Sequence, residues 1–199
     1  MPKTLDREWD SDSFIKYRNA FPGEYASSSP QFKAHFQDLV ARDVKAPYLK
    51  ALQGYLWEEG YKAGELKAPL FPDVAPAMAR WTDSGRKVMI YSSGSVPAQK
   101  LLFAHTDAES PNLCSLITDW FDTVNAGPKM EAASYAKIAS GYPGFDLKEW
   151  LFLSDNLKEV EAAREAGMQS LPVVRPGNPP LPSEHTLALD AIQDFDNLS

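Results

Sequence analysis

The chain has 199 residues, of which 44% are hydrophobic and 24% charged, so it can bury a full core as one domain with a smaller appendage. A formal net charge of -7 argues against nucleic-acid partners and anionic membranes, because both need clustered Lys and Arg. The single cysteine, Cys114, excludes an intrachain disulfide. No apolar run approaches the roughly 18 residues of a membrane span. We therefore expect a soluble, cytoplasmic protein, with a nuclear location left open.

The first part of the chain, residues 1–70, has apolar residues at helical spacing and predicts a helical subdomain. It ends where Pro69 and Pro72 break the helical pattern, and Asp73 is expected to cap the next helix. The residues with helical spacing are Phe32, Phe36, Leu39, Val40, Tyr48, Leu49, Leu52 and Leu56.

The remaining part, residues 71–199, alternates short apolar runs with amphipathic helical stretches. This alternation is typical of parallel strands joined by helical crossovers, so the predicted fold class is α/β with a Rossmann-like parallel sheet. Helices are expected over 74–85, 96–105, 130–141, 157–167 and 185–195, and apolar strand segments over 87–92, 119–124, 149–154 and 170–175.

Two of the strand ends carry residues that suit an anion, since ligands of open α/β sheets bind at the carboxyl ends of strands. Ser92, Ser93 and Gly94 lie before a predicted helix, where hydroxyls, backbone N–H groups and the helix dipole favour phosphate. Helix capping alone is the alternative. Lys129 lies before another helix and could neutralise a phosphate group; a solvated surface lysine is the alternative.

A third strand end carries acids. Asp155 follows the predicted strand 149–154, and Glu159 lies one helical turn later. This arrangement suits Mg²⁺, which takes one or two carboxylates and keeps waters or substrate oxygens as its other ligands. The alternative is that Asp155 caps the next helix and that Glu159 is a solvated acid.

Hydroxyl, lysine and acid at successive strand ends resemble the haloacid dehalogenase-like phosphatases. The resemblance makes Ser92 and Lys129 phosphate-binding residues, with Lys129 also catalytic, and Asp155 a Mg²⁺ ligand supported by Glu159. The stretches "YSSGSVPAQKLLF" and "VVRPGN" more narrowly resemble the enolase-phosphatases of methionine salvage. The implied substrate is a small phosphorylated metabolite, 2,3-diketo-5-methylthiopentyl-1-phosphate, which is enolised and dephosphorylated to an acireductone.

The same resemblance makes the helical subdomain, residues 1–70, a cap that closes over the substrate of the core, residues 71–199. Polar or aromatic groups on a closing lid can orient a substrate. Packing within the cap is the alternative for the two aromatic candidates, and a solvated stem is the alternative for the lysine. The candidates are Gln53, Trp57, Tyr61 and Lys67.

The family attacks phosphorus with an Asp of an Asp-x-Asp or Asp-x-Glu element on a buried first strand, which should precede the cap. Asp10 and Asp12 satisfy Asp-x-Asp, but charged residues precede them, and the residues that follow predict a helix that one of them would cap. We therefore expect a chain that is shortened at its N-terminus, inactive or nearly so, and weak in Mg²⁺ affinity.

In the family, the absent strand lies between the strand that ends at Ser92 and the strand that ends before Asp155. We expect these two strands to pair directly, or another segment or a second molecule to fill the slot. We then expect dimerisation or strand exchange of this shortened chain, whereas the full-length members of the family are expected to be monomers.

Two other classes of function stay open. One is a non-catalytic phosphate-binding or interaction protein on the same fold. The other is a serine hydrolase at Ser92 or Ser93, but the chain lacks the Gly-x-Ser-x-Gly element there, and we expect no labelling by a fluorophosphonate. Cys114 is expected to be a buried structural thiol. The histidines His35, His105 and His185 lack the spacing of metal ligands.

Overall fold

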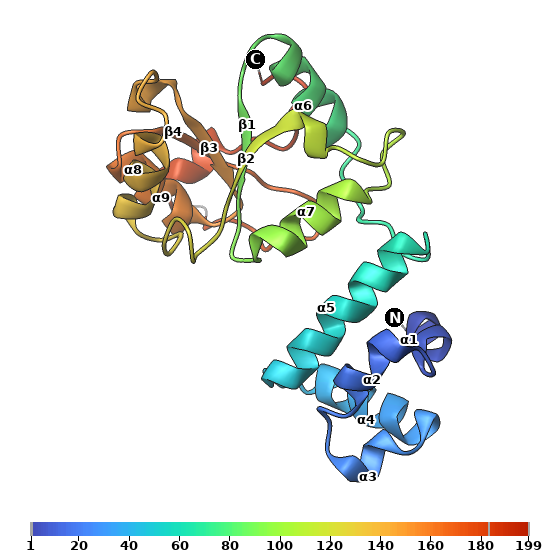
Figure 1. Cartoon of the computed structure of the whole chain (residues 1–199). Coiled ribbons are helices and arrows are strands. Elements are labelled where there is room, and N and C mark those ends of the chain that lie inside the picture. Colours follow the sequence, from blue (N-terminus) through green and yellow to red (C-terminus); the bar gives the residue numbers. More distant parts are fainter. Residues whose placement is uncertain (1, 183, 199) are drawn as a thin grey trace. The chain divides into compact units, whose positions relative to one another are not determined.

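The computed structural model describes residues 2–182 and 184–198. The chain divides into two compact units, Met1–Ala68 and Pro69–Ser199 (Figure 1). Unit 1 is helical. Its helices are α1 (Pro2–Glu8), α2 (Asp12–Arg18), α3 (Gly23–Ala26), α4 (Ser29–Ala41) and α5 (Pro47–Lys62).

The core of unit 1 is aromatic and aliphatic. Of the eight residues whose spacing predicted helices, all but Val40 and Tyr48 are buried, which confirms the prediction. Phe14 and Phe32 pack edge to face at 5.8 Å between ring centroids, and both are fully buried. Because a buried Phe or Leu removes a large apolar area from water, this cluster stabilises the unit without any strand.

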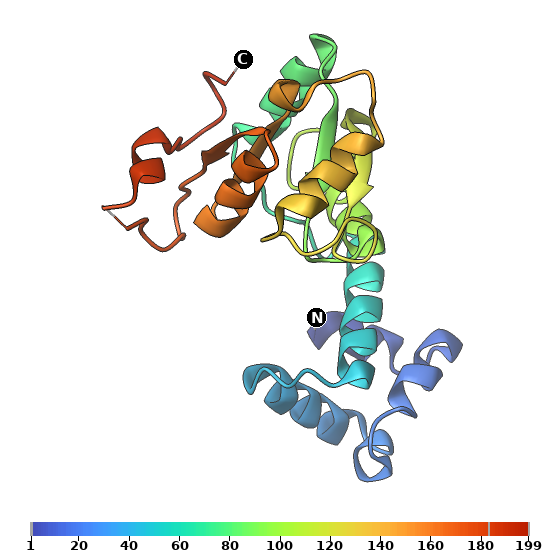
Figure 2. The ribbon, with the colours of Figure 1, turned by 90° about the vertical axis from the view of Figure 1, so that its left-hand side faces the viewer.

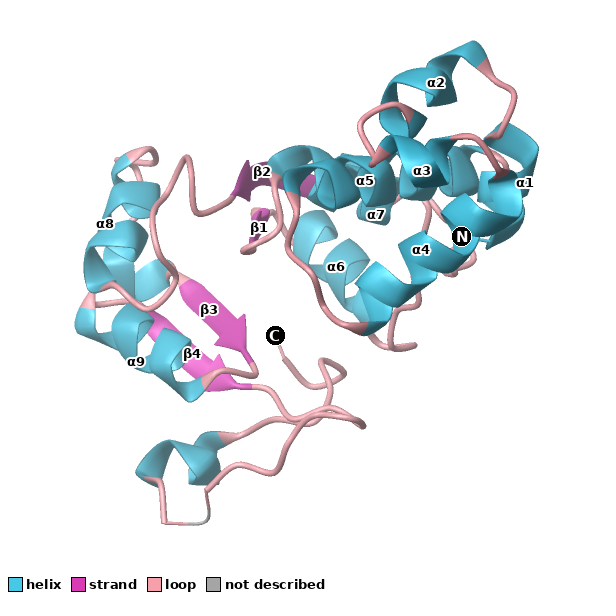
Figure 3. Cartoon of the chain, turned by 90° about the horizontal axis from the view of Figure 1, so that it is seen from below, coloured by secondary structure: helices cyan, strands magenta, loops and turns pink. Residues whose placement is uncertain are grey.

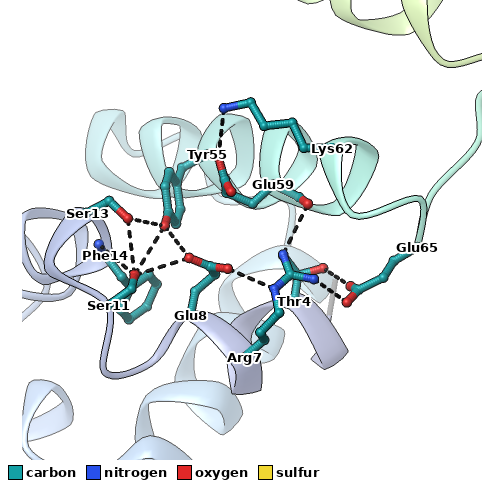
Figure 4. A network of polar contacts seen from close by, with 10 residues as sticks. All are labelled: Thr4, Arg7, Glu8, Ser11, Ser13, Phe14, Tyr55, Glu59, Lys62 and Glu65. Atoms are coloured by element: carbon teal, nitrogen blue, oxygen red, sulfur yellow. Dashed lines mark hydrogen bonds and ion pairs between the residues drawn. The ribbon is translucent and has the colours of Figure 1, made fainter.

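A network of polar side chains joins α1 to α5 within unit 1 (Figure 4). Tyr55 donates to Glu8 Oε2 at 2.7 Å, and this hydrogen bond is the main cause that lowers the pKa of Glu8. Arg7 pairs with Glu8 and Glu65, and its Nη2 donates to the Glu59 carbonyl at 3.1 Å. These contacts tie the C-terminal end of α1 to α5 and to Glu65, which lies just beyond α5.

The Asp-x-Asp stretch belongs to this helical unit. Ser11, between the two acids, is the N-cap of α2, and its Oγ accepts from the backbone N–H of Phe14 at 3.3 Å. Asp12 is the first helical residue. The expectation that Asp10 or Asp12 caps the helix is therefore wrong by one residue, because the serine hydroxyl reaches the first-turn amide.

Unit 2 alternates strands and helices, as Figure 2 shows, and confirms the α/β fold class. Three short 3₁₀ helices cover Cys114–Leu116, Leu147–Glu149 and Thr186–Asp190. The longer elements are α6 (Val74–Asp83), β1 (Val88–Tyr91), α7 (Val96–Ala104), β2 (Ile117–Phe121), α8 (Ala132–Ser140), β3 (Leu151–Ser154), α9 (Leu157–Glu165) and β4 (Gln169–Pro172).

The helix predicted over 185–195 is wrong beyond its first turn. Only Thr186–Asp190 is helical, and Ile192 instead forms a parallel bridge with Val173. The Val174 N–H donates to the Ile192 carbonyl at 2.9 Å, and the Ile192 N–H donates to the Pro172 carbonyl at 3.0 Å. Extended backbone satisfies these groups where a continued helix could not.

The strands form two parallel pairs (Figure 3). β1 pairs with β2, from Val88 opposite Ile117 to Tyr91 opposite Phe121, and β3 pairs with β4. Among the described residues, no strand pairs with the second edge of β1 or β3. The expectation that these two strands pair directly, or that another segment of this chain fills the slot, is therefore wrong.

Side chains bridge β1 and β3 where backbone does not. The Tyr91 and Phe152 ring centroids lie 6.4 Å apart, and Tyr135 of α8 contacts both rings. These contacts hold the halves of unit 2 together, while every residue of β1 stays half-buried and Leu151 is exposed. Filling of the slot by a second molecule stays a prediction.

Candidate active site

The loop after β1 joins that strand to α7. The Ser92 N–H donates to the Phe121 carbonyl of β2 at 3.0 Å, and Ser92 Oγ accepts from the Gly94 N–H at 3.1 Å. Ser95 is the N-cap of α7, but its side chain makes no capping hydrogen bond. Helix capping by a side chain therefore does not account for these serines, and Ser93 and Gly94 are exposed to solvent.

Asp122 is a site residue that the sequence analysis missed. It is buried directly after β2, and its Oδ2 accepts from Val96 N, the first amide of α7, at 3.0 Å. Its Oδ1 accepts from Val124 N and Asn125 N at 2.9 Å. The Asn125 N–H, followed by that of Val96, lowers the pKa of Asp122. It was missed because the strand was predicted over 119–124, whereas β2 ends at Phe121, so that Asp122 stands at the strand end where ligands bind.

Gln99 is a second missed residue. Its Nε2 donates to the Gly94 carbonyl at 2.7 Å and to the Phe121 carbonyl at 2.8 Å, and its side chain is buried. The amide therefore ties the loop after β1 to the end of β2. Only the tertiary structure brings these two carbonyls together, so the sequence held no signal for this role.

The loop that carries Lys129 is held by three hydroxyl groups. Tyr91 Oη donates to the Gly127 carbonyl at 2.7 Å, and Ser134 Oγ donates to the Pro128 carbonyl at 2.8 Å. Tyr135 Oη donates to the carbonyl of Lys129 itself at 2.6 Å. Three successive carbonyls are thus fixed, which sets the direction in which the lysine leaves the backbone.

Lys129 is not a solvated surface lysine. Its Nζ lies 2.6 Å from Glu159 Oε2, with side-chain exposures of 19% and 13% for the two residues. The ammonium also lies 5.8 Å from the Tyr91 ring centroid and 5.9 Å from that of Phe152. Ser154 Oγ donates to the same Glu159 oxygen at 2.7 Å. The lysine is therefore placed at the ends of both β1 and β3.

Asp155 follows β3 and is exposed, and its Oδ2 accepts from Asn178 Nδ2 at 2.9 Å. It does not cap α9, because Asn156 is the N-cap and accepts from Lys158 N. Among residues 2–182 and 184–198, no group of three His, Cys, Asp or Glu side chains could hold a metal. Asp155 offers one carboxylate, the type of ligand that Mg²⁺ takes, whereas Glu159 does not fit as a ligand because it contacts Lys129; metal binding stays a prediction.

The candidates from the helical subdomain lie in unit 1. Gln53, Trp57 and Tyr61 follow at four-residue intervals along α5, so they share one stripe of the helix. Trp57 is 42% exposed and so is not a core residue of the unit, and Lys67 is exposed beyond the helix. Their contact with a substrate stays a prediction.

The remaining candidate residues do not form a second site. Cys114 is half-buried in a 3₁₀ helix, less than expected, and burial raises the pKa of its thiol. His35 stacks on Tyr25 at 3.8 Å between ring centroids, and His185 lies 3.2 Å from Glu161. Throughout the described residues, no helix is long and apolar enough to cross a membrane.

Proteins of known family are similar to this chain over its whole length. A sequence model of haloacid dehalogenase-like hydrolases matches residues 7–167. The enolase-phosphatase E1 of Verticillium alfalfae is 63% identical over 199 residues, which are 100% of this chain and 78% of that protein. The enolase-phosphatase E1 of Pyricularia oryzae is 61% identical over 198 residues, 100% of this chain and 86% of that protein.

A solved structure is similar as well. The crystal structure of the UTR4 protein from Saccharomyces cerevisiae aligns with a TM-score of 0.79 at 37% sequence identity. The alignment covers 99% of this chain and 86% of that one. The similarity therefore includes both the helical unit and the α/β unit.

Proposed function

We propose that this chain is a phosphatase of methionine salvage. The chain belongs to the haloacid dehalogenase-like hydrolases and, within them, to the enolase-phosphatases. Its substrate would be 2,3-diketo-5-methylthiopentyl-1-phosphate. The observation that supports the proposal is the placement of Lys129, whose ammonium contacts Glu159 and lies over the rings of Tyr91 and Phe152, on the two strands that lead into Ser92 and Asp155. A cytoplasmic location agrees with this substrate class.

The chain's own residues would bind and orient the phosphate. Lys129 neutralises oxygens of the phosphoryl group, and the Ser92 hydroxyl and the backbone N–H groups of the loop other than that of Gly94, which donates to Ser92 Oγ, donate to them. The rings of Tyr91 and Phe152 flank the ammonium and exclude water, which strengthens its attraction for the anion. Mg²⁺, held by Asp155, would supply further charge stabilisation to the phosphoryl oxygens.

We also propose that this chain by itself releases phosphate slowly or not at all. The acids that could attack phosphorus are otherwise engaged: both oxygens of Asp122 accept from backbone N–H groups, and Glu159 contacts Lys129. Asp10 and Asp12 belong to the helical unit and flank the N-cap of α2. The unpaired edges of β1 and β3 agree with an incomplete active site.

Phosphate release in the presence of Mg²⁺ tests both proposals. This chain is compared with the same chain extended at its N-terminus by an apolar strand that carries an Asp-x-Asp pair. We expect turnover by the extended chain alone, and its loss in the extended K129M variant. Turnover by the unextended chain would contradict the impaired activity, and no turnover by either chain would contradict the phosphatase assignment.

The second candidate function is that of a non-catalytic phosphate-binding protein. It is favoured by the loop after β1, because hydrogen bonds from Gln99 and to Asp122 hold this loop in the absence of a ligand. The extended chain decides between the two functions. Binding of inorganic phosphate without turnover would support the binding protein. A fluorophosphonate should label neither Ser92 nor Ser93.

We propose that unit 1 is the cap of this phosphatase and that the α5 stripe of Gln53, Trp57 and Tyr61 faces the substrate. The exposure of Trp57 supports this role, since an exposed aromatic side chain on a lid can bury itself against a ligand. In the extended chain, W57A should raise KM more than it lowers kcat. An unchanged KM would remove Trp57 from the site.

A further inference from the structure

The segment after β4 makes a tight turn at Arg175-Pro176-Gly177-Asn178. The Asn178 N–H donates to the Arg175 carbonyl at 3.0 Å, and Gly177 has φ +96. Proline followed by a glycine with positive φ is the preferred central pair of a type II turn. The sequence "RPGN" therefore builds a rigid turn whose last residue projects back toward the sheet.

The start of this turn is anchored by a buried ion pair. Arg175 Nη1 and Nη2 donate to the two oxygens of Asp73, at 3.0 and 2.6 Å, and both side chains are about nine-tenths buried, with exposures of 11% and 10%. The Arg175 guanidinium also lies 4.9 Å from the Phe71 ring and 4.4 Å from the Phe195 ring. Such a bidentate, stacked arginine has little freedom to move.

The turn fixes the orientation of the Asn178 amide. The Arg175 N–H donates to Asn178 Oδ1 at 2.7 Å, which requires that the oxygen and not the nitrogen of the amide face the backbone. Asn178 Nδ2 is therefore directed away from the turn, and it donates to Asp155 Oδ2 at 2.9 Å. The buried Asp73–Arg175 pair thereby supports a contact with the acid at the end of β3.

We propose that Asn178 is a positioning residue that makes Asp155 a ligand through one oxygen and so favours Mg²⁺ over Ca²⁺. This inference rests on the proposed function, in which Asp155 binds the metal. A carboxylate oxygen that accepts from the amide is held back from the cation, and the other oxygen is left to bind it. Mg²⁺ needs near-octahedral geometry, whereas Ca²⁺ accepts both oxygens of a carboxylate.

Titration calorimetry of this chain with Mg²⁺ and with Ca²⁺, carried into the millimolar range, tests the inference. In N178A we expect the Mg²⁺ affinity to fall about ten-fold, as for other groups that orient a ligand, while the Ca²⁺ affinity stays within about two-fold. N197A, which alters another exposed asparagine, should leave both affinities unchanged. D155N should abolish binding of both ions.

Each outcome bears on a separate claim. If N178A binds each ion as tightly as the unsubstituted chain does, or loses affinity for both ions to the same extent, the positioning role is overturned while the proposed function stands. Saturable Mg²⁺ binding that survives D155N, or its absence from the unsubstituted chain, would overturn the metal part of the proposed function and this inference with it. Thermal unfolding of N178A monitors the fold.

Discussion

Lys129 is in contact with an acid before any substrate binds. Its 2.6 Å contact with Glu159 lies at a partly buried position, where an unpaired charge costs more free energy than at the surface. A bound phosphate group would therefore share the Lys129 ammonium with Glu159, because the ammonium is already paired. The pair thus contributes to the stability of the substrate-free protein, and it holds the lysine in the orientation in which it would meet a phosphate group.

A double-mutant cycle measures this coupling. We expect K129M to lower the free energy of unfolding by about 2 kcal/mol, because it leaves Glu159 partly buried without its cation. Adding E159Q should recover about 1 kcal/mol, since the remaining amide carries no charge. Urea unfolding gives all four values. Strictly additive effects of the two substitutions would show that the pair does not contribute.

Asp122 makes the free energy of unfolding depend on pH in the acid range. Its pKa is lowered in the folded protein by the backbone N–H groups of Asn125 and Val96, so the unfolded chain binds the proton more readily. The stabilisation is full above the ordinary Asp pKa of about 4 and disappears as pH falls through the lowered value. As pH is lowered from neutral into the acid range, the urea midpoint of unfolding should fall less steeply for D122N than for the unsubstituted chain. The control variant D83N should behave like the unsubstituted chain.

At the scale of elements, the loop between β2 and α8 shows how a strand end is made rigid. Gly127 has φ +125, and a Cβ atom there would lie 2.5 Å from Ser134 Oγ. The hydroxyl groups of Tyr91, Ser134 and Tyr135 then fix three successive carbonyls. Glycine is needed because the backbone turns into a region that other residues avoid and passes close to α8.

G127A should therefore be destabilising. We expect a loss of about 2 kcal/mol in the free energy of unfolding, from the positive φ and from displacement of the Ser134 hydroxyl. G144A is the matched control, because its Cβ would have no heavy atom within 4 Å and its φ is not positive. Chemical unfolding of both variants tests this. A cost for G127A no larger than that for G144A would contradict the loop's role.

At the scale of the molecule, each unit has a hydrophobic core of its own. Unit 1 buries Phe14, Phe32 and Leu52 among its helices, while unit 2 has clusters around Tyr135 and around Met78. Clusters without shared residues can lose stability separately.

Core truncations should therefore act locally. L52A should lower the stability of unit 1 by about 3 kcal/mol, because Leu52 is fully buried and leaves a cavity. M78A is its counterpart in unit 2. Hydrogen exchange read by mass spectrometry should show faster exchange in peptides of the altered unit alone. Faster exchange throughout the chain in both variants would show that the units unfold together.

Local pattern was enough to predict most of the helices and the approximate positions of the four strands, but not the exact end of β2 or the C-terminal segment after residue 190. Helical spacing predicted the buried face of α4 and α5, and the alternation after residue 74 predicted the parallel strands. Asp73 shows the limit: it occupies the N-cap of α6 as expected, but its carboxylate binds Arg175 and the Phe195 N–H. Partners more than a hundred residues away leave no trace in the spacing of neighbouring residues.

By itself, the sequence determined the α/β class, the two-part organisation and the positions of Ser92, Lys129 and Asp155 after strands, because these follow from local periodicity and chain order. Only the tertiary structure decided that Lys129 meets Glu159, that Asn178 meets Asp155, and that β1 and β3 pair with β2 and β4 but not with each other. Those outcomes depend on side-chain contacts between distant segments, whose free energies compete only once the chain has folded.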